Sequence, residues 1–257
     1  MLKGLYTAYT GLANEQNRMD ILTNNLANAS TVGYKKEGAT SQAFDDILSY
    51  KIKDASESPN NAKPMGTLNM GVKIGENYTD YSQGSFRVTG NTYDLALAGE
   101  GFFEIEFTNK NDEVSTKYTR DGSFTLDKDG YLVNADGDYV MGTRGRIKLD
   151  PLKETKIDDN GMISQNGVTV AALRIVDFPD YDILEKYGEN YYQPVEEVRP
   201  PLANATVKSG YLEMSNVQVV SEMVNLISIT RAYESNQKIM QTYDNSLEIA
   251  VNQLGKI

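Results

Sequence analysis

The chain has 257 residues, 40% of them apolar, and a net charge of −11 at pH 7. This composition supports one sizeable core or two small ones and excludes a disordered protein. Cys, His and Trp are absent. The absence of Cys and His excludes Ser-His-Asp and Cys-His catalysis and any zinc site with nitrogen or sulfur ligands.

The charge is unevenly placed along the chain. Residues 1–30 carry no net charge and residues 215–257 carry −1, so the middle carries −10. An acidic middle disfavours nucleic acid as a partner, because nucleic-acid binding needs clustered Lys and Arg. Near-neutral ends suit self-association, since they do not repel their own copies.

The first expected element is a helix over residues 2–28. Its main apolar column recurs at every seventh residue, and a partly polar companion column runs beside it. The main column is Leu5, Leu12, Met19 and Leu26, and the companion column is Leu2, Tyr9, Gln16 and Thr23. Polar residues in such a seam weaken a coiled coil, so we expect this arm to be buried against other helices. The polar run over residues 14–18 also argues against a cleaved signal peptide.

A turn-rich motif over residues 24–35 ends this helix. Asn28, Ser30 and Gly33 have the chemistry of helix ends and turns. A capped helix end is by itself sufficient to explain the asparagines of this motif.

Residues 36–67 are polar and are expected to be irregular, with one helical turn formed by Phe44, Ile47 and Leu48. The segment is either a packing loop between subunits in the assembled state or a mobile linker, and its composition slightly favours the linker.

From Gly71 the pattern changes to short alternating runs separated by Gly, Asn and Asp, which predicts strands. The expected strands are residues 72–74, 78–81, 95–97, 102–107, 117–118, 123–126, 131–133, 139–141, 147–149 and 162–164, and an apolar run over 168–178. Asp-Gly at 129–130 and 136–137 predicts hairpin turns, because glycine supplies the positive φ that a tight turn needs. We therefore expect a mostly antiparallel β domain, followed by an irregular return path over residues 179–206.

Residues 211–254 contain no Gly or Pro and predict one long helix. At about 1.5 Å per residue it would extend roughly 65 Å. The main heptad column is Leu226, Tyr233, Met240, Leu247 and Leu254, and the companion column is Met223, Thr230, Gln237, Asp244 and Val251. A cap at Ser215 or Asn216 would move the helix start to Val217. A pair of amphipathic core helices is the alternative, but so long a helix cannot bury its whole face on one small core.

The predicted fold class is α+β: long N- and C-terminal helices, forming a coiled-coil-like pair, and a central, mostly antiparallel β domain. The expected segments are an N-terminal helical arm (1–34), an irregular linker (35–70), a β domain (71–210) and a C-terminal helical arm (211–257).

Three features of the sequence are compatible with catalysis or ligand binding, but each has a simpler explanation. The acidic loops at 127–130 and 134–138 do not have calcium-loop spacing and are better explained as hairpin turns. Residues 99–101 lack the third glycine of a dinucleotide loop. Paired carboxylates could serve a glycosidase, but with 36 acidic residues such pairs arise by chance. We therefore expect no catalytic residues, no cofactor and no metal, and no apolar window approaches the length of a membrane span.

Several motifs resemble the bacterial flagellar rod and hook proteins. Residues 24–35 are similar to the N-terminal signature of this family, and residues 222–227, 231–234 and 236–238 to its C-terminal signature. Residues 95–103 and 118–124 resemble its central domain. Both ends match in order, which is far more specific than either short motif alone.

The resemblance implies a structural subunit of the flagellar basal-body rod, proximal or distal, that polymerises into a helical tube and transmits torque from motor to hook. The implied partners are further copies of the chain, neighbouring rod and hook subunits, and the flagellar export apparatus, with export to the basal body and without signal cleavage. No nucleic acid and no membrane insertion are expected. A hook-type or phage-tail-like self-assembling protein is the alternative.

The expected assembly interface combines the two helical columns with the family signatures. Its residues are Leu5, Leu12, Met19, Asn24, Asn25, Leu26, Asn28, Gly33, Tyr34, Met223, Leu226, Ile227, Arg231, Tyr233, Met240, Leu247, Val251 and Leu254.

Overall fold

The computed structural model describes residues 2–51, 63–109, 113–188, 190–196 and 198–254. The chain divides into two compact units. The helical unit comprises residues 1–26, 37–79 and 219–257, and the β unit comprises residues 27–36 and 80–218. Both ends of the chain therefore belong to one unit and most of its middle to the other, in agreement with the predicted α+β class.

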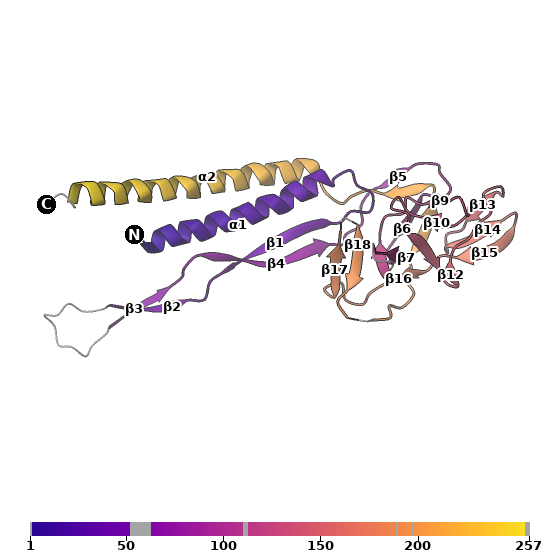
Figure 1. Cartoon of the computed structure of the whole chain (residues 1–257), viewed down its shortest axis with the longest axis horizontal. Coiled ribbons are helices and arrows are strands. Elements are labelled where there is room, and N and C mark those ends of the chain that lie inside the picture. The colour runs from indigo at the N-terminus through magenta and orange to yellow at the C-terminus, as the bar shows by residue number, and fades with distance from the viewer. Residues whose placement is uncertain (1, 52–62, 110–112, 189, 197, 255–257) are drawn as a thin grey trace. The chain divides into compact units, whose positions relative to one another are not determined.

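Two long helices dominate the helical unit (Figure 1). Helix α1 spans Leu2–Ala27, and helix α2 spans Val219–Ile249 and continues as a short π-helix, η1, over Ala250–Leu254. The first helix agrees with the prediction to one residue. The second is shorter than predicted, with 31 residues and a length of roughly 46 Å.

The start of the second helix differs from the sequence expectation. Residues Tyr211–Glu213 form a strand, and neither expected cap initiates α2. Ser215 Oγ accepts a hydrogen bond from the Val217 N–H at 3.3 Å, and Asn216 Oδ1 accepts one from the Lys36 N–H at 2.8 Å. Both side chains thus stabilise the chain before the helix begins.

The two helices approach each other at two glycines of α1. A Cβ added at Gly4 would overlap the Tyr243 hydroxyl, and one added at Gly11 would lie 3.1 Å from Asn236 Nδ2. Gly11 follows Gly4 by seven residues, while Asn236 precedes Tyr243 by seven. The helices therefore run antiparallel, with small residues allowing close approach (Figure 1).

The expected irregular segment is instead a β-ribbon in the helical unit. Strand β1 (Lys36–Ala43) pairs with β4 (Val72–Asp80), and β2 (Ile47–Lys51) pairs with β3 (Lys63–Leu68). The helical turn expected at residues 44–48 is wrong, because Ile47 and Leu48 lie in β2. Pairing partners far along the chain override the low β propensity of β1.

A nine-stranded sheet forms most of the β unit. Its strand order is β17 (Leu184–Tyr187), β18 (Tyr191–Pro194), β8 (Val114–Thr119), β7 (Phe102–Thr108), β11 (Tyr139–Gly142), β10 (Leu132–Val133) and β9 (Thr125–Leu126), with β12 (Gly145–Arg146) on β11 and β16 (Ile175–Val176) on β7. The hairpin β17–β18 lies in the stretch expected to be an irregular return path, so that expectation is wrong.

Three smaller sheets complete the β unit. They are β13 (Thr155–Ile157), β14 (Met162–Gln165) and β15 (Val168–Ala172); β19 (Thr206–Ser209) with β6 (Leu95–Ala98); and β20 (Tyr211–Glu213) with β5 (Phe86–Val88). The described strand pairs of the β unit are antiparallel, as predicted. The apolar run 168–178 splits into β15 and β16, and residues 147–149 contribute a single bridge, Tyr131 to Lys148, in place of a strand.

The predicted hairpin turns are confirmed. The Gly130 N–H donates to the Asp127 carbonyl at 2.9 Å, and the Gly137 N–H donates to the Asn134 carbonyl at 3.2 Å. Both glycines have positive φ, 82° and 91°, which a residue with a Cβ adopts only with strain.

The described hydrophobic core lies in the β unit and forms two clusters. The larger is built from Leu95, Leu97, Phe103, Ile105, Phe124, Leu132, Val140, Ile147, Leu149, Ile163, Leu173, Ile175, Tyr191 and Val207. The smaller is aromatic-rich and contains Phe102, Tyr118, Val176, Phe178, Leu184 and Tyr192. Tyr191 and Tyr192, which lie in the segment expected to be irregular, thus contribute to the core.

Candidate assembly site

The inward face of α2 contains the main predicted column. Leu226, Tyr233, Met240 and Leu247 are each half-buried. The second inward column differs from the prediction: it consists of Glu222, Ile229, Asn236, Tyr243 and Ala250, all buried or half-buried. The expected companion column is mostly exposed, including Met223, Gln237, Asp244 and Val251. Inward polar residues such as Glu222 and Asn236 carry no apolar signal, which explains the missed column.

Helix α1 shows the same division. Leu5, Leu12, Met19 and Leu26 are half-buried, whereas Tyr9, Gln16 and Thr23 of the expected companion column are exposed. The buried positions are Ala8, Thr10, Asn14 and Asn25. Thr10 lies against Gly71, and Asn14 exchanges hydrogen bonds with Ser41 at 3.0 and 3.2 Å. Polar side chains of α1 therefore hold the β-ribbon.

The outward face of α2 is apolar near its start. Val220 is 77% exposed, Val224 61%, Ile227 54% and Met223 47%. The spacing i, i+3, i+4, i+7 places these four on one face, which we call the outward apolar face. It lies opposite the inward columns, since 3.6 residues make one turn. Arg231, one turn further on, is exposed as well. Grouped exposed apolar residues of this kind mark interaction surfaces.

The asparagine-rich motif shapes the chain after α1. Asn25 is fully buried; its Nδ2 donates to the Glu37 carbonyl at 2.7 Å and its Oδ1 accepts from the Glu37 N–H at 2.9 Å. Asn28 Oδ1 accepts from the Thr31 hydroxyl at 3.0 Å. Asn24 is exposed. Asn25 therefore fastens β1 to the end of α1, a role beyond capping the helix.

Gly33 and Tyr34 are buried inside the β unit. Gly33 has φ +70°, and a Cβ there would overlap the backbone of Arg120 and Asp121. Its N–H donates to the Glu213 carbonyl at 2.8 Å. Tyr34 is 1% exposed, with Lys186 Nζ 4.2 Å from its ring centroid. These two predicted residues thus pack within the chain.

The residue after Tyr34 begins an arrangement that sequence reasoning missed. Lys35 Nζ lies 2.6 Å from Glu213 Oε1, and Arg120 Nη1 lies 3.4 Å from Glu213 Oε2. The three side chains are at most 3% exposed, and we call them the buried ion triad. Burial lowers the pKa of Lys35, while the Glu213 carboxylate opposes that shift.

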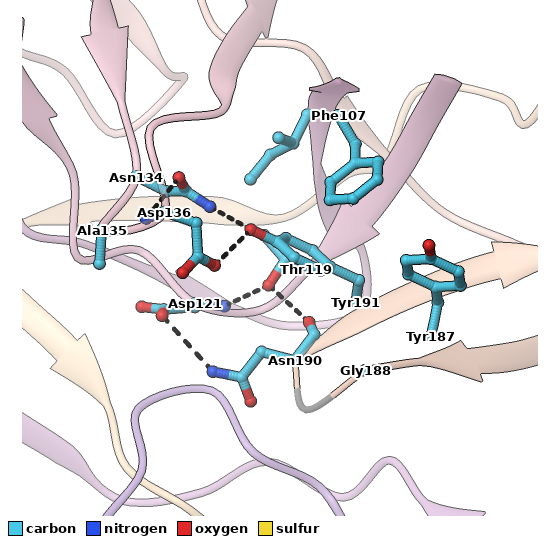
Figure 2. A pocket seen from close by; sticks show the side chains of 11 residues that line it. Phe107, Thr119, Asp121, Asn134, Ala135, Asp136, Tyr187, Gly188, Asn190 and Tyr191 are labelled. Atoms are coloured by element: carbon cyan, nitrogen blue, oxygen red, sulfur yellow. Dashed lines mark hydrogen bonds between the residues drawn. The ribbon is translucent and has the colours of Figure 1, made fainter. Parts of the chain in front are cut away.

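A cavity of about 410 Å³ opens in the β unit. Figure 2 shows the aromatic rings of Phe107, Tyr187 and Tyr191 together with Asp121, Asp136 and Asn190 around it. The polar groups bond to one another: the Tyr191 hydroxyl lies 2.8 Å from a carboxylate oxygen of Asp136. Burial raises the pKa of Asp121, against hydrogen bonds from Ser123 and Asn190. The polar groups that line the cavity thus stabilise the loops around it.

The described ranges lack both a metal-binding cluster and a membrane-spanning helix. No group of three or more His, Cys, Asp or Glu side chains is placed there to hold a metal ion. No helix in that part of the chain is long and apolar enough to cross a membrane. Leu254 lies at the end of η1.

Known protein families match three parts of the chain. Residues 5–35 match the family described as flagella basal body rod protein, residues 96–165 the flagellar hook protein FlgE/F/G D1 domain, and residues 208–254 the flagellar basal body rod FlgEFG protein C-terminal. The first match covers α1 from residue 5 onward, the last contains the whole of α2, and the middle match lies in the β unit.

Curated relatives are similar over nearly the whole chain. The flagellar basal-body rod protein FlgG of Bacillus subtilis is 34% identical, covering 98% of this chain and 99% of the relative. The flagellar basal-body rod protein FlgF of Caulobacter vibrioides is 35% identical, covering 97% and 98%. The FlgG protein of Borreliella burgdorferi is 30% identical, covering 98% of each.

Proposed function

The chain belongs to the flagellar basal-body rod family, and on that premise we propose how it builds the rod. It is a structural subunit of the flagellar basal-body rod, the shaft that transmits torque from motor to hook. We propose that copies of the chain stack into a helical tube through their terminal helices. A heterologous interface that does not close on itself generates such a filament.

The observation that supports this proposal is the outward apolar face of α2. Its four residues are 47–77% exposed in the single chain, although burying such side chains stabilises a protein by roughly 1.5–3 kcal/mol each. A neighbouring copy would cover them. Met223 and Ile227 of the predicted interface lie on this face. Leu226, Tyr233, Met240 and Leu247 lie on the inward columns and would hold α2 against its own unit.

The contacts of Gly4 and Gly11 favour α1 and α2 as a coiled-coil-like pair. The pair is incomplete in one chain, because Asn236 and Glu222 occupy its inward columns and polar seam residues restrict partners at a cost in stability. We therefore propose that the arms gain much of their stability in the assembled rod. The four segments expected from the sequence remain our division by role: two arms, the ribbon segment and the β domain.

The relatives bear the names FlgG and FlgF, so a proximal or a distal position in the rod is proposed without choosing between them. Neighbouring rod and hook subunits would be its axial partners. Passage through the flagellar export apparatus to the periplasmic side, without signal cleavage, completes the proposal. A hook-type or phage-tail-like assembly is the alternative, and its discrete or differently curved particles would distinguish it.

Electron microscopy of the concentrated full chain tests the proposal. We expect helical tubes from the wild type and none from Ile227→Asp, because a carboxylate on the outward apolar face cannot be buried unpaired. Val168→Asp is the matched control: Val168 is 66% exposed in β15 of the β unit and its replacement should leave tubes intact. Equal tube formation by both variants would contradict the proposed interface.

A further inference from the structure

Residues that are far apart in the sequence meet in the buried ion triad of the β unit. Glu213 accepts contacts from Lys35 at 2.6 Å and Arg120 at 3.4 Å, and Lys35 and Glu213 are 178 positions apart. Lys35 Nζ also donates to the Ser82 carbonyl at 2.8 Å, and Asp80 attracts it more weakly than Glu213 does. Within the triad, the carboxylate of Glu213 therefore pairs with two cations that come earlier in the chain.

Backbone pairing also joins residues 206–213 to strands that come much earlier in the chain. Strand β19 pairs with β6, whose Leu95, Ala96 and Leu97 are fully buried in the core. Strand β20 pairs with β5, and the Glu213 carbonyl accepts the Gly33 N–H at 2.8 Å. The Gly84 N–H donates to Glu213 Oε1 at 3.0 Å. Until residues 206–216 arrive, these backbone groups and both cations lack these partners.

An unfinished β unit would therefore be unstable in a specific way. A buried charge without its partner is strongly destabilising, and buried backbone groups need hydrogen bonds. Hairpins with short loops, such as β14–β15, can form from local contacts alone. Strand β6 and the surroundings of Lys35 and Arg120 cannot be completed until late in the chain.

We infer that Glu213 acts as a closing latch: the β unit closes only when residues 206–216 join it. A chain emerging from its N-terminus would keep this unit open until almost the whole sequence is available. The latch is a property of the fold and does not rest on the proposed function.

Pulsed hydrogen exchange during refolding of the full chain tests the latch. The amides of β6 should gain protection in the same kinetic phase as those of residues 206–213, after the hairpin β14–β15. If β6, β7 and β8 become protected while residues 206–213 still exchange freely, the latch is wrong.

Substitutions separate the charge of Glu213 from its position. Glu213→Gln should raise the unfolding equilibrium constant about a hundredfold or more, because two buried cations lose their carboxylate, and should delay the closing phase. Glu104→Gln is the matched control: Glu104 is also buried and ion-paired, to Arg174 at 2.9 Å, but outside the closing segment. Glu104→Gln should leave unchanged the order in which the amides become protected during refolding.

A triple replacement keeps the test decisive if Glu213→Gln does not fold. Lys35→Met, Arg120→Met and Glu213→Met together remove the triad and fill its volume with apolar side chains. Stability should return to within about tenfold of the wild-type equilibrium constant, since replacing buried ion networks by packed apolar residues is often neutral. A triple variant as unstable as Glu213→Gln alone would show that ion pairing with Glu213 is not what closes the unit.

Discussion

Gly4 of α1 packs directly against the ring of Tyr243 in α2. A Cβ at Gly4 would lie 2.8 Å from Tyr243 Cζ and overlap its hydroxyl. This contact explains a glycine in the first turns of a helix, where it lowers helix stability by about 1 kcal/mol relative to alanine.

Gly4→Ala should therefore raise the helix propensity of α1 while weakening the contact between α1 and α2. We expect lower protection of α2 amides near residue 243 in hydrogen exchange. In a Tyr243→Ala background the same substitution should be neutral or stabilising, because the obstructing ring is gone. A double-mutant cycle measures this coupling; additive effects would contradict the contact.

Asn25 holds the β-ribbon through the backbone of Glu37. Asn25→Ala removes both hydrogen bonds to the Glu37 backbone, at a cost of roughly 2 kcal/mol. We expect faster exchange of β1 and β4 amides and a lower urea midpoint. Gln16→Ala is the control in the same helix, because Gln16 is exposed and such changes usually stay within about 0.5 kcal/mol. Equal losses from both variants would argue against the fastening role of Asn25.

The sequence predicts the helices well because their signals are local. An apolar residue at every seventh position and the absence of Gly and Pro over residues 211–254 suffice to place both helical arms. The Asp-Gly turns are predicted for the same reason. The second inward column of α2 is not predicted, because Asn236 and Glu222 face inward without being apolar. Their placement depends on the neighbouring surface.

Long-range pairing limits what the pattern of residues can predict. Strand β1 has the sequence KEGATSQA, which resembles a loop, and is held by Asn14 and Asn25 from α1. Lys35 and Glu213 each look like ordinary surface charges. Only the fold brings them together, since no local pattern links positions 178 apart.

The stability of the β unit should depend on pH through Asp121. Burial raises the pKa of its carboxyl above the ordinary 3.8, with a smaller contribution from Asp136. The folded state therefore favours protonated Asp121, and this contribution is present below pH 3.8 and lost as pH rises through the folded pKa. Asp121→Asn keeps an acceptor oxygen for Ser123 and removes the titration. Relative to wild type, its unfolding free energy should rise between pH 3 and pH 7.

Asp150 provides a control of opposite sign. The Leu152 N–H and Lys153 lower the pKa of its exposed carboxyl, so its contribution is present above pH 3.8 and lost as pH falls through the folded pKa. Asp150→Asn should therefore lose stability relative to wild type between pH 3 and pH 7. Urea titrations of both variants across this range provide the measurement, and slopes of the same sign would refute the assignment for Asp121.

Alanine substitutions at Gly33 and Gly137 distinguish the cost of backbone strain from the cost of steric overlap. Both have positive φ, 70° and 91°, so alanine at either position costs about 1–2 kcal/mol in backbone conformation. At Gly137 a Cβ meets no atom within 4 Å, whereas at Gly33 it meets the backbone of Arg120 and Asp121. Overpacking of this kind costs a further 1–3 kcal/mol or so.

Gly33→Ala should thus destabilise the β unit by about 2–5 kcal/mol and Gly137→Ala by about 1–2, as measured by urea unfolding. The amide at position 33, which donates to the Glu213 carbonyl, and the neighbouring amides of residues 213–214 should exchange faster only in Gly33→Ala. If both variants lost the same stability, the close approach of Gly33 to Arg120 would carry no energetic weight.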